Sequence, residues 1–78
     1  MRVINVIEIV DNNTQGIESF GIFEEQLSQD VVDKAEANFK MKAKENGCTA
    51  ADEEMEEIIS EGYYENGTYS VNLVWSEI

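Results

Sequence analysis

The sequence predicts a single α+β domain in the order ββααβ, with a three-stranded antiparallel sheet and two helices packed on one face. Three observations predict this class. The chain begins with segments rich in β-branched residues, continues with two segments whose apolar residues recur at helical spacing, and ends with an alternating segment. A length of 78 residues suits one domain, 1–78, with one small core.

The first two predicted strands form a hairpin. Residues 3–10, "VINVIEIV", carry apolar side chains on both faces, which is typical of a central strand. The segment 11–16, "DNNTQG", combines the residues that favour a hairpin loop. Residues 17–24 form the second strand, with Phe20 and Ile22 on one face. We therefore expect the first strand in the middle of the sheet, with the last strand on its other side; a place for the last strand beside the second strand stays open.

The first predicted helix lies within residues 27–47, "LSQDVVDKAEANFKMKAKENG". Ser28 is placed to cap this helix, and Leu27 to pack on Val32. A core-facing stripe follows at helical spacing and consists of Val32, Ala35, Phe39 and Ala43. Three lysines suit the negative end of the helix dipole, and the pair Asn46-Gly47 is expected to end the helix.

The second predicted helix follows Thr49, a capping residue with Asp52 three positions later. Its narrow apolar stripe consists of Ala51, Met55, Ile58, Ile59 and Gly62, and the glycine is expected to end the helix. An Asn-Gly pair at 66–67 then predicts a tight turn. The last strand, 68–76, directs alternate side chains to the core, namely Tyr69, Val71, Leu73 and Trp75.

The charge distribution excludes several classes of partner. The chain has 17 acidic and 5 basic residues, a net charge of −12, and no Lys or Arg follows Lys44. A surface of this sign repels nucleic-acid phosphates and anionic lipids, and attracts basic proteins. We therefore expect a basic nucleic-acid-binding protein as the partner, and neither direct nucleic-acid binding nor membrane binding.

The sequence lacks the residues of common catalytic and metal sites. It has no histidine, the most frequent general base. A single cysteine, Cys48, permits neither an internal disulfide nor a thiolate metal cluster, which fits a reducing cytosol. The N-terminal apolar run is interrupted by Glu8 before it reaches signal-peptide length, and "DNNTQG" lacks the final Glu of a calcium loop. We expect a non-enzymatic, cytoplasmic protein without cofactor or metal.

The second helix concentrates acidic residues without any base. They cover its surface outside the apolar stripe and are Asp52, Glu53, Glu54, Glu56, Glu57 and Glu61. Each like-charged pair four residues apart destabilises the helix by roughly 0.2–0.5 kcal/mol. At about 1.5 Å rise per residue the helix carries about one charge per 2.3 Å, against about one per 1.7 Å of duplex DNA. A groove built for phosphates therefore suits such a helix.

The segments "DEEMEE" (52–57) and "SEGYYENGTYSVNLVWSEI" (60–78) combine an acidic helix, an aromatic turn and an alternating final strand. In this combination the second half of the chain resembles the small acidic proteins of phages and mobile elements, some of which are anti-restriction or anti-CRISPR inhibitors. The resemblance is one of general type and carries over no functional residues. It implies an inhibitor that mimics nucleic-acid phosphates.

Two hypotheses of function follow. In the first, the protein inhibits a CRISPR effector, a restriction enzyme or another nucleic-acid-handling protein, and its partner-binding residues are Asp52, Glu53, Glu56, Glu57, Glu61, Tyr63, Tyr64 and Glu65. Here the two tyrosines act as flanking anchors, although both also suit a core. In the second, the chain is a small structural or accessory protein whose acidity only keeps it soluble, and the outer sheet face makes the contact. The oligomeric state stays open.

Overall fold

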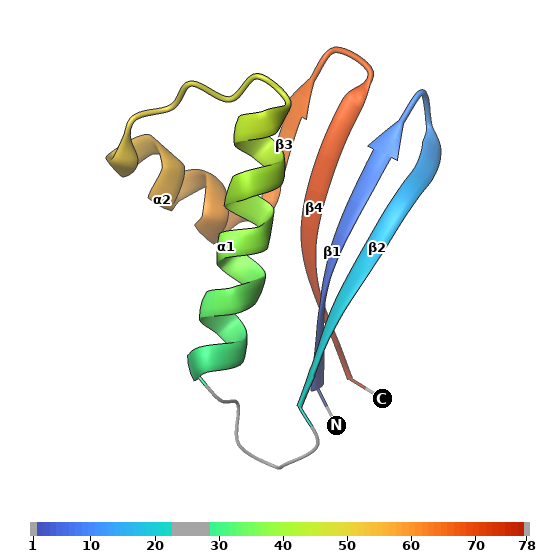
Figure 1. The fold of residues 1–78 in the computed structure, drawn as a ribbon, viewed down its shortest axis with the longest axis vertical. Coiled ribbons are helices and arrows are strands. Elements are labelled where there is room, and N and C mark those ends of the chain that lie inside the picture. The colour runs from blue at the N-terminus through green and yellow to red at the C-terminus, as the bar shows by residue number, and fades with distance from the viewer. Residues whose placement is uncertain (1, 23–28, 78) are drawn as a thin grey trace.

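The computed structural model describes residues 2–22 and 29–77. Two helices cover one face of a four-stranded antiparallel sheet (Figure 1). The elements in chain order are β1 (Arg2–Val10), β2 (Asn13–Ile22), α1 (Gln29–Glu45), α2 (Asp52–Glu61), β3 (Tyr63–Asn66) and β4 (Tyr69–Glu77). The α+β class and the two layers are therefore confirmed. The prediction of three strands is wrong, because β3 adds a fourth.

The central position predicted for the first strand is confirmed. The strand order is β2-β1-β4-β3, so that β1 pairs with both β2 and β4. Ile4 and Val6 of β1 point towards the helices and are fully buried. Ile7 and Ile9 point to the opposite face of the sheet, which carries no helix, and are only half-buried. We call this second face the open face.

The first hairpin is tighter than the predicted loop 11–16. Asp11 and Asn12 alone form the turn, with φ of 52° and 66°, and β2 begins at Asn13. Positive φ at both positions is the requirement of a type I′ turn, and Asp and Asn meet it without glycine. The last four residues of the predicted loop, 13–16, therefore belong to β2, and a bulge after Glu8 accommodates the one that has no partner in β1, Gln15.

The second hairpin explains the missed strand. Asn66 pairs with Tyr69, and Gly67 and Thr68 form the turn between them. The predicted Asn-Gly turn is therefore displaced by one residue, and the four residues before it are a strand. β3 has only four residues and is largely exposed, as an edge strand is. Its sequence therefore shows no alternation of apolar and polar residues that would predict a strand.

The core lies between the sheet and the helices. The predicted stripe of α1 is confirmed for Ala35, Phe39 and Ala43, which are fully buried, while Val32 is half-buried. The buried residues that pack with Phe39 and Ala43 are Val6, Cys48, Met55, Tyr69 and Val71. The predicted roles of Leu27 and Ser28, and the predicted end of the second strand at 23–24, lie outside the described residues.

Candidate functional site

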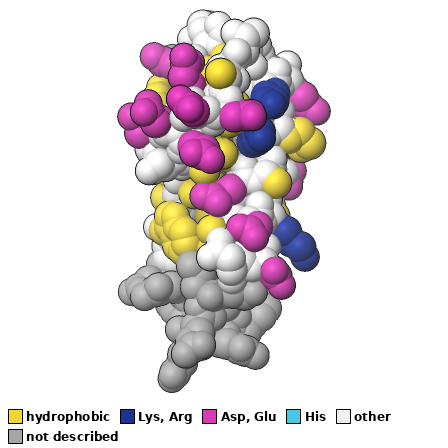
Figure 2. All heavy atoms as spheres, turned by 90° about the vertical axis from the view of Figure 1, so that its left-hand side faces the viewer, with side chains coloured by type: hydrophobic (Ala, Val, Ile, Leu, Met, Phe, Trp, Pro, Cys, Tyr) yellow, Lys and Arg dark blue, Asp and Glu magenta, His cyan; other side chains and the backbone are white. Residues whose placement is uncertain are grey.

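The acidic side chains of α2 form one exposed surface. All six of them are exposed, namely Asp52, Glu53, Glu54, Glu56, Glu57 and Glu61. The helix is held from its other side, where Met55 is buried and Ile58 and Ile59 are half-buried against the core. Figure 2 shows Asp and Glu side chains gathered on the side of the molecule where α2 lies. We call the six residues the acidic surface.

The start of α2 differs from the prediction. Thr49 does not cap the helix; the N-cap is Ala51, which makes no side-chain capping hydrogen bond. The first helical hydrogen bond runs from the Met55 N–H to the Ala51 carbonyl at 2.8 Å. Cys48 is buried and Ala50 packs against the core, so core packing accounts for the later start better than a cap does. Three acids in the first turn still interact favourably with the helix dipole.

Gly62 ends α2 as predicted and attaches the helix to the sheet. Its φ is 71°, and its N–H donates to the carbonyl oxygens of Ile58 and Ile59. Its own carbonyl accepts a hydrogen bond from the Leu73 N–H at 2.8 Å. A Cβ at this position would lie 2.8 Å from the Leu73 carbonyl oxygen, so β4 leaves no room for a side chain. The orientation of the acidic surface therefore depends on a glycine.

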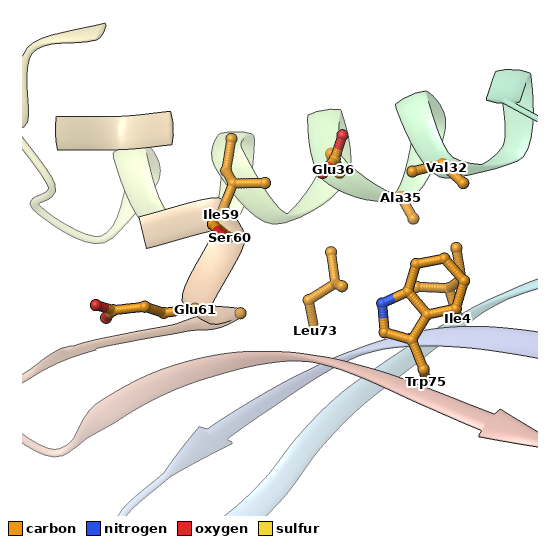
Figure 3. A pocket seen from close by; sticks show the side chains of 10 residues that line it. Ile4, Val32, Ala35, Glu36, Ile59, Ser60, Glu61, Leu73 and Trp75 are labelled. Carbon is orange, nitrogen blue, oxygen red and sulfur yellow. The ribbon is translucent and has the colours of Figure 1, made fainter. Parts of the chain in front are cut away.

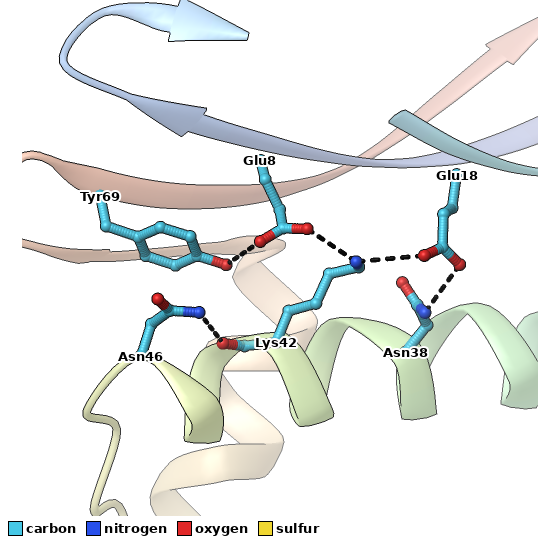
Figure 4. Close-up of polar contacts among 6 residues, drawn as sticks. All are labelled: Glu8, Glu18, Asn38, Lys42, Asn46 and Tyr69. Atoms are coloured by element: carbon cyan, nitrogen blue, oxygen red, sulfur yellow. Dashed lines mark hydrogen bonds and ion pairs between the residues drawn. The ribbon is translucent and has the colours of Figure 1, made fainter. Parts of the chain in front are cut away.

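The lysine nearest the core does not neutralise the acidic surface. Lys42 of α1 points to the sheet, where its Nζ lies 2.7 Å from Glu8 Oε1 and 3.1 Å from Glu18 Oε1 (Figure 4). The Tyr69 hydroxyl donates to Glu8 Oε2 at 2.9 Å, and Asn38 Nδ2 donates to Glu18 Oε2 at 2.9 Å. These five residues form what we call the inter-layer network. In the described part of the chain, no ion pair involves a carboxylate of α2.

The inter-layer network favours the ionised forms of Glu8 and Lys42. The hydrogen bond from Lys42 lowers the pKa of Glu8, and the same contact raises the pKa of Lys42. Burial, followed by the hydrogen bond to Glu8, raises the pKa of Tyr69. Sequence reasoning placed Lys42 at the helix end and Tyr69 in the core but missed their partners, because the pairs join residues 34 and 61 positions apart.

The structure brings together the α2 residues of the predicted site but not those of β3. Neighbouring residues in a strand point to opposite faces. Tyr64 is half-buried and packs against the core. Tyr63 lies on the open face, where its hydroxyl donates to Glu65 Oε2 at 2.8 Å, and this hydrogen bond raises the pKa of Tyr63. Tyr63 and Glu65 therefore belong to a different surface from the acidic helix.

An aromatic residue that shares a pocket with the end of α2 is Trp75. A pocket of about 220 Å³ opens between α1, the end of α2 and β4, and Trp75 forms part of its wall together with Ile59 and Leu73 (Figure 3). Trp75 points to the helix side as predicted but is 47% exposed, which corrects its expected place in the core. It pairs with Ile4 near one end of the sheet.

No other chemistry competes with the acidic surface. Among residues 2–22 and 29–77, no three His, Cys, Asp or Glu side chains are grouped to hold a metal ion. The described helices are too short or too polar to cross a membrane. Comparisons with known protein families, characterised proteins and solved structures find no significant match. The function is therefore inferred from the geometry of this chain.

Proposed function

We propose that this protein is a non-enzymatic inhibitor that places its acidic surface in the basic groove of a nucleic-acid-handling protein, as anti-CRISPR and anti-restriction proteins of the mimic type do. The observation that carries the proposal is the exposure of six carboxylates on α2 without a paired cation in the described chain. Lys42 forms its ion pairs with Glu8 and Glu18 and not with the carboxylates of α2.

The charge arrangement on α2 supports binding more than solubility. Surfaces that serve solubility usually intersperse both signs. Three pairs of acids on α2 lie four residues apart, and each costs roughly 0.2–0.5 kcal/mol. Their density, about one charge per 2.3 Å of helix axis, is of the order found along duplex DNA. Lysines and arginines that hold phosphates would meet a similar charge density here.

Trp75 supplies an exposed apolar side chain across a pocket from the end of α2. Its partly exposed indole and the end of α2 border the same pocket, which Glu36 and Glu61 also line. Exposed tryptophan is enriched among the residues that dominate protein interfaces, and its face attracts arginine. In the proposed complex this residue takes the anchoring role first assigned to the tyrosines of β3.

The open face favours a second candidate function. It exposes Ile17, Val74 and Tyr63, which are 58%, 42% and 41% exposed. A structural or accessory protein that contacts its partner through this face would need no acidic helix. Substitutions distinguish the two functions. Loss of activity on changing the acidic surface supports inhibition, and loss on changing the open face supports the structural or accessory role.

A competition experiment tests the proposed inhibition. A labelled duplex is bound to each of a panel of CRISPR effectors and restriction endonucleases, and displacement by the protein is followed by fluorescence anisotropy. We expect displacement from at least one target, and weaker displacement as salt rises, because the contacts are ionic. The single variant Glu57→Lys, in the acidic surface, should no longer displace the duplex. Neither should the double variant that combines Glu56→Lys and Glu57→Lys.

The matched control is Glu65→Lys, which makes the same charge change on the open face. It should displace the duplex as the unmodified protein does. Equal displacement by the double variant and the unmodified protein would contradict the proposal. So would a failure to displace DNA from every member of the panel.

A further inference from the structure

We infer that two copies of this chain pair face to face through the open faces of their sheets. The proposal does not depend on the inhibitory function, because it concerns the side of the sheet opposite the helices. Its occupant is a second copy of the chain. The inference rests on the side-chain pattern of β1, the hydrogen bonds within the open face, its low charge and its area.

The side-chain pattern of β1 is that of a strand covered on both sides. Ile4 and Val6 are buried under the helices, while Ile7 and Ile9 of the same strand point to the open face. Apolar residues on both faces are typical of strands buried between two layers. Among the described residues, one copy of the chain provides only one of those layers, and a second copy supplies the other.

The register of the sheet gathers the apolar side chains of the open face. Ile17 pairs with Ile7, which pairs with Asn72, and Asn72 pairs with Tyr63, so this row crosses all four strands. Val74 lies two residues further along β4. Apolar and aromatic residues in neighbouring positions across strands make a continuous surface for another sheet.

Three polar side chains beside this row hydrogen-bond to one another. Ser19 Oγ donates to Asn5 Oδ1 at 2.7 Å, and Asn5 Nδ2 donates to Ser76 Oγ at 2.9 Å. Burying a polar group is costly chiefly when it loses its hydrogen bonds. Because these three residues bond across β2, β1 and β4, a second sheet covers them at little cost.

Charge selects a second copy as the partner. The described strands direct Glu8 and Glu18 to the helix side, and the one carboxylate on the open face is Glu65, on the edge strand β3. Two chains of net charge −12 repel each other through their helix layers. The open face is the large surface through which they approach with their acidic helices furthest apart. A basic partner, by contrast, finds little to attract it there.

The area of the open face is sufficient for a weak dimer. At about 3.3 Å per residue and about 4.8 Å between strands, a sheet with these strand lengths has a face of roughly 500 Å². Two such faces bury roughly 1,000 Å², the lower end for specific interfaces. Packing of identical faces about a twofold axis closes the assembly as a dimer and leaves both acidic surfaces exposed on its outside.

Sedimentation equilibrium of the purified protein tests the dimer. We expect the average mass to rise towards twice that of the monomer between about 10 μM and about 1 mM, as suits a small interface. The dimer should strengthen as salt rises from about 50 to about 500 mM, because salt screens the repulsion between the copies. Target binding through the acidic surface has the opposite salt dependence.

Two substitutions and a matched control locate the interface. Ile17→Lys and Val74→Lys should each weaken the dimer at least about tenfold, because each places an ammonium group in an apolar contact. Met41→Lys, at a 47% exposed position of α1, makes the same chemical change on the helix side and should leave the dimer intact. Circular dichroism confirms the fold of each variant, and the more exposed Ile17 keeps the test valid if Val74→Lys unfolds.

Two outcomes would overturn the inference. One is a monomer at every concentration and salt tested. The other is a dimer that neither substitution weakens, which would place the contact at the exposed edges of β2 and β3 or on the helices.

Discussion

The inter-layer network and the acidic surface use the same residue types in opposite ways. In the network, Glu8 and Glu18 share Lys42, and a tyrosine and an asparagine complete the hydrogen bonds. On α2, six carboxylates stand exposed without a paired cation among the described residues. The network connects α1 to β1 and β2, whereas the carboxylates of α2 form no ion pair with any other described residue.

This difference separates charge that serves the fold from charge that strains it. Removing a partner from the network should destabilise the protein, because a partly shielded charge is left without its counterion. Removing charge from α2 should stabilise it, because repulsion is relieved. The following four predictions test that contrast, in order of decreasing effect on the free energy of unfolding.

The largest effect is expected at the junction that orients the acidic surface. Gly62→Ala should lower the free energy of unfolding by about 3 kcal/mol, since the residue has positive φ and its Cβ would meet the Leu73 carbonyl oxygen. The matched control is Gly67→Ala, at φ 61° with open space around it, for which about 1 kcal/mol is expected. Urea denaturation measures both. Equal losses would show that the contact with β4 is unimportant.

The second effect is expected from the lysine of the network. Lys42→Met keeps the length of the side chain but leaves Glu8 and Glu18 unpaired, and should cost about 2 kcal/mol, between the values for exposed and buried pairs. Lys44→Met, at an exposed position of α1, should change stability by less than about 0.5 kcal/mol. Thermal denaturation of the two variants compares them. A network without structural importance would give them the same midpoint.

The third effect concerns pH. Because the pKa of Glu8 is lower in the folded protein than its ordinary value of 4.5, the ionised carboxylate stabilises the fold above pH 4.5 and loses this contribution as pH falls through the folded value. Glu8→Gln should therefore cost about 1 kcal/mol at pH 7, and this difference should shrink below pH 4.5. Urea titrations of both proteins at a series of pH values measure it. A difference that is constant with pH would exclude the ionised form as the stabilising one.

The smallest effect has the opposite sign. Glu56→Lys with Glu57→Lys turns repulsive pairs on α2 into attractive ones and should raise the free energy of unfolding by about 0.5–1 kcal/mol at low salt. High salt should remove most of the gain. Thermal denaturation at both salt concentrations measures the change. A loss of stability would mean that these carboxylates have favourable partners in the chain.

Sequence reasoning succeeded where one face of an element meets the core. The spacing of Ala35, Phe39 and Ala43, the two-sided pattern of β1 and the glycine that ends α2 were all readable from the sequence. Such patterns depend on a repeat within one segment, which burial imposes directly. The exposure of the acidic helix was predictable for the same reason, since its charges surround a narrow apolar stripe.

It failed where distant segments decide the outcome. The start of α2 follows the burial of Cys48, not the nearest capping residue. Lys42 finds partners on two strands, which no local pattern reveals. Trp75 alternates as a core residue does, yet a pocket lies between it and the helices and its side chain is exposed. In each case the missing information was the relative placement of elements, which a single sequence does not contain.

The pairing of β1 with β4 also determines how the chain reaches this structure. Each hairpin joins residues that are close in sequence. Ile4 and Trp75, by contrast, pair across a long stretch of chain that includes both helices. Closing so long a loop costs conformational entropy before the central contacts repay it. The hairpins can form early, but the seam between them, ending at the hydrogen bond from the Asp11 N–H to the Thr68 carbonyl, joins late. We therefore expect folding to be slower than for a helical bundle of this length.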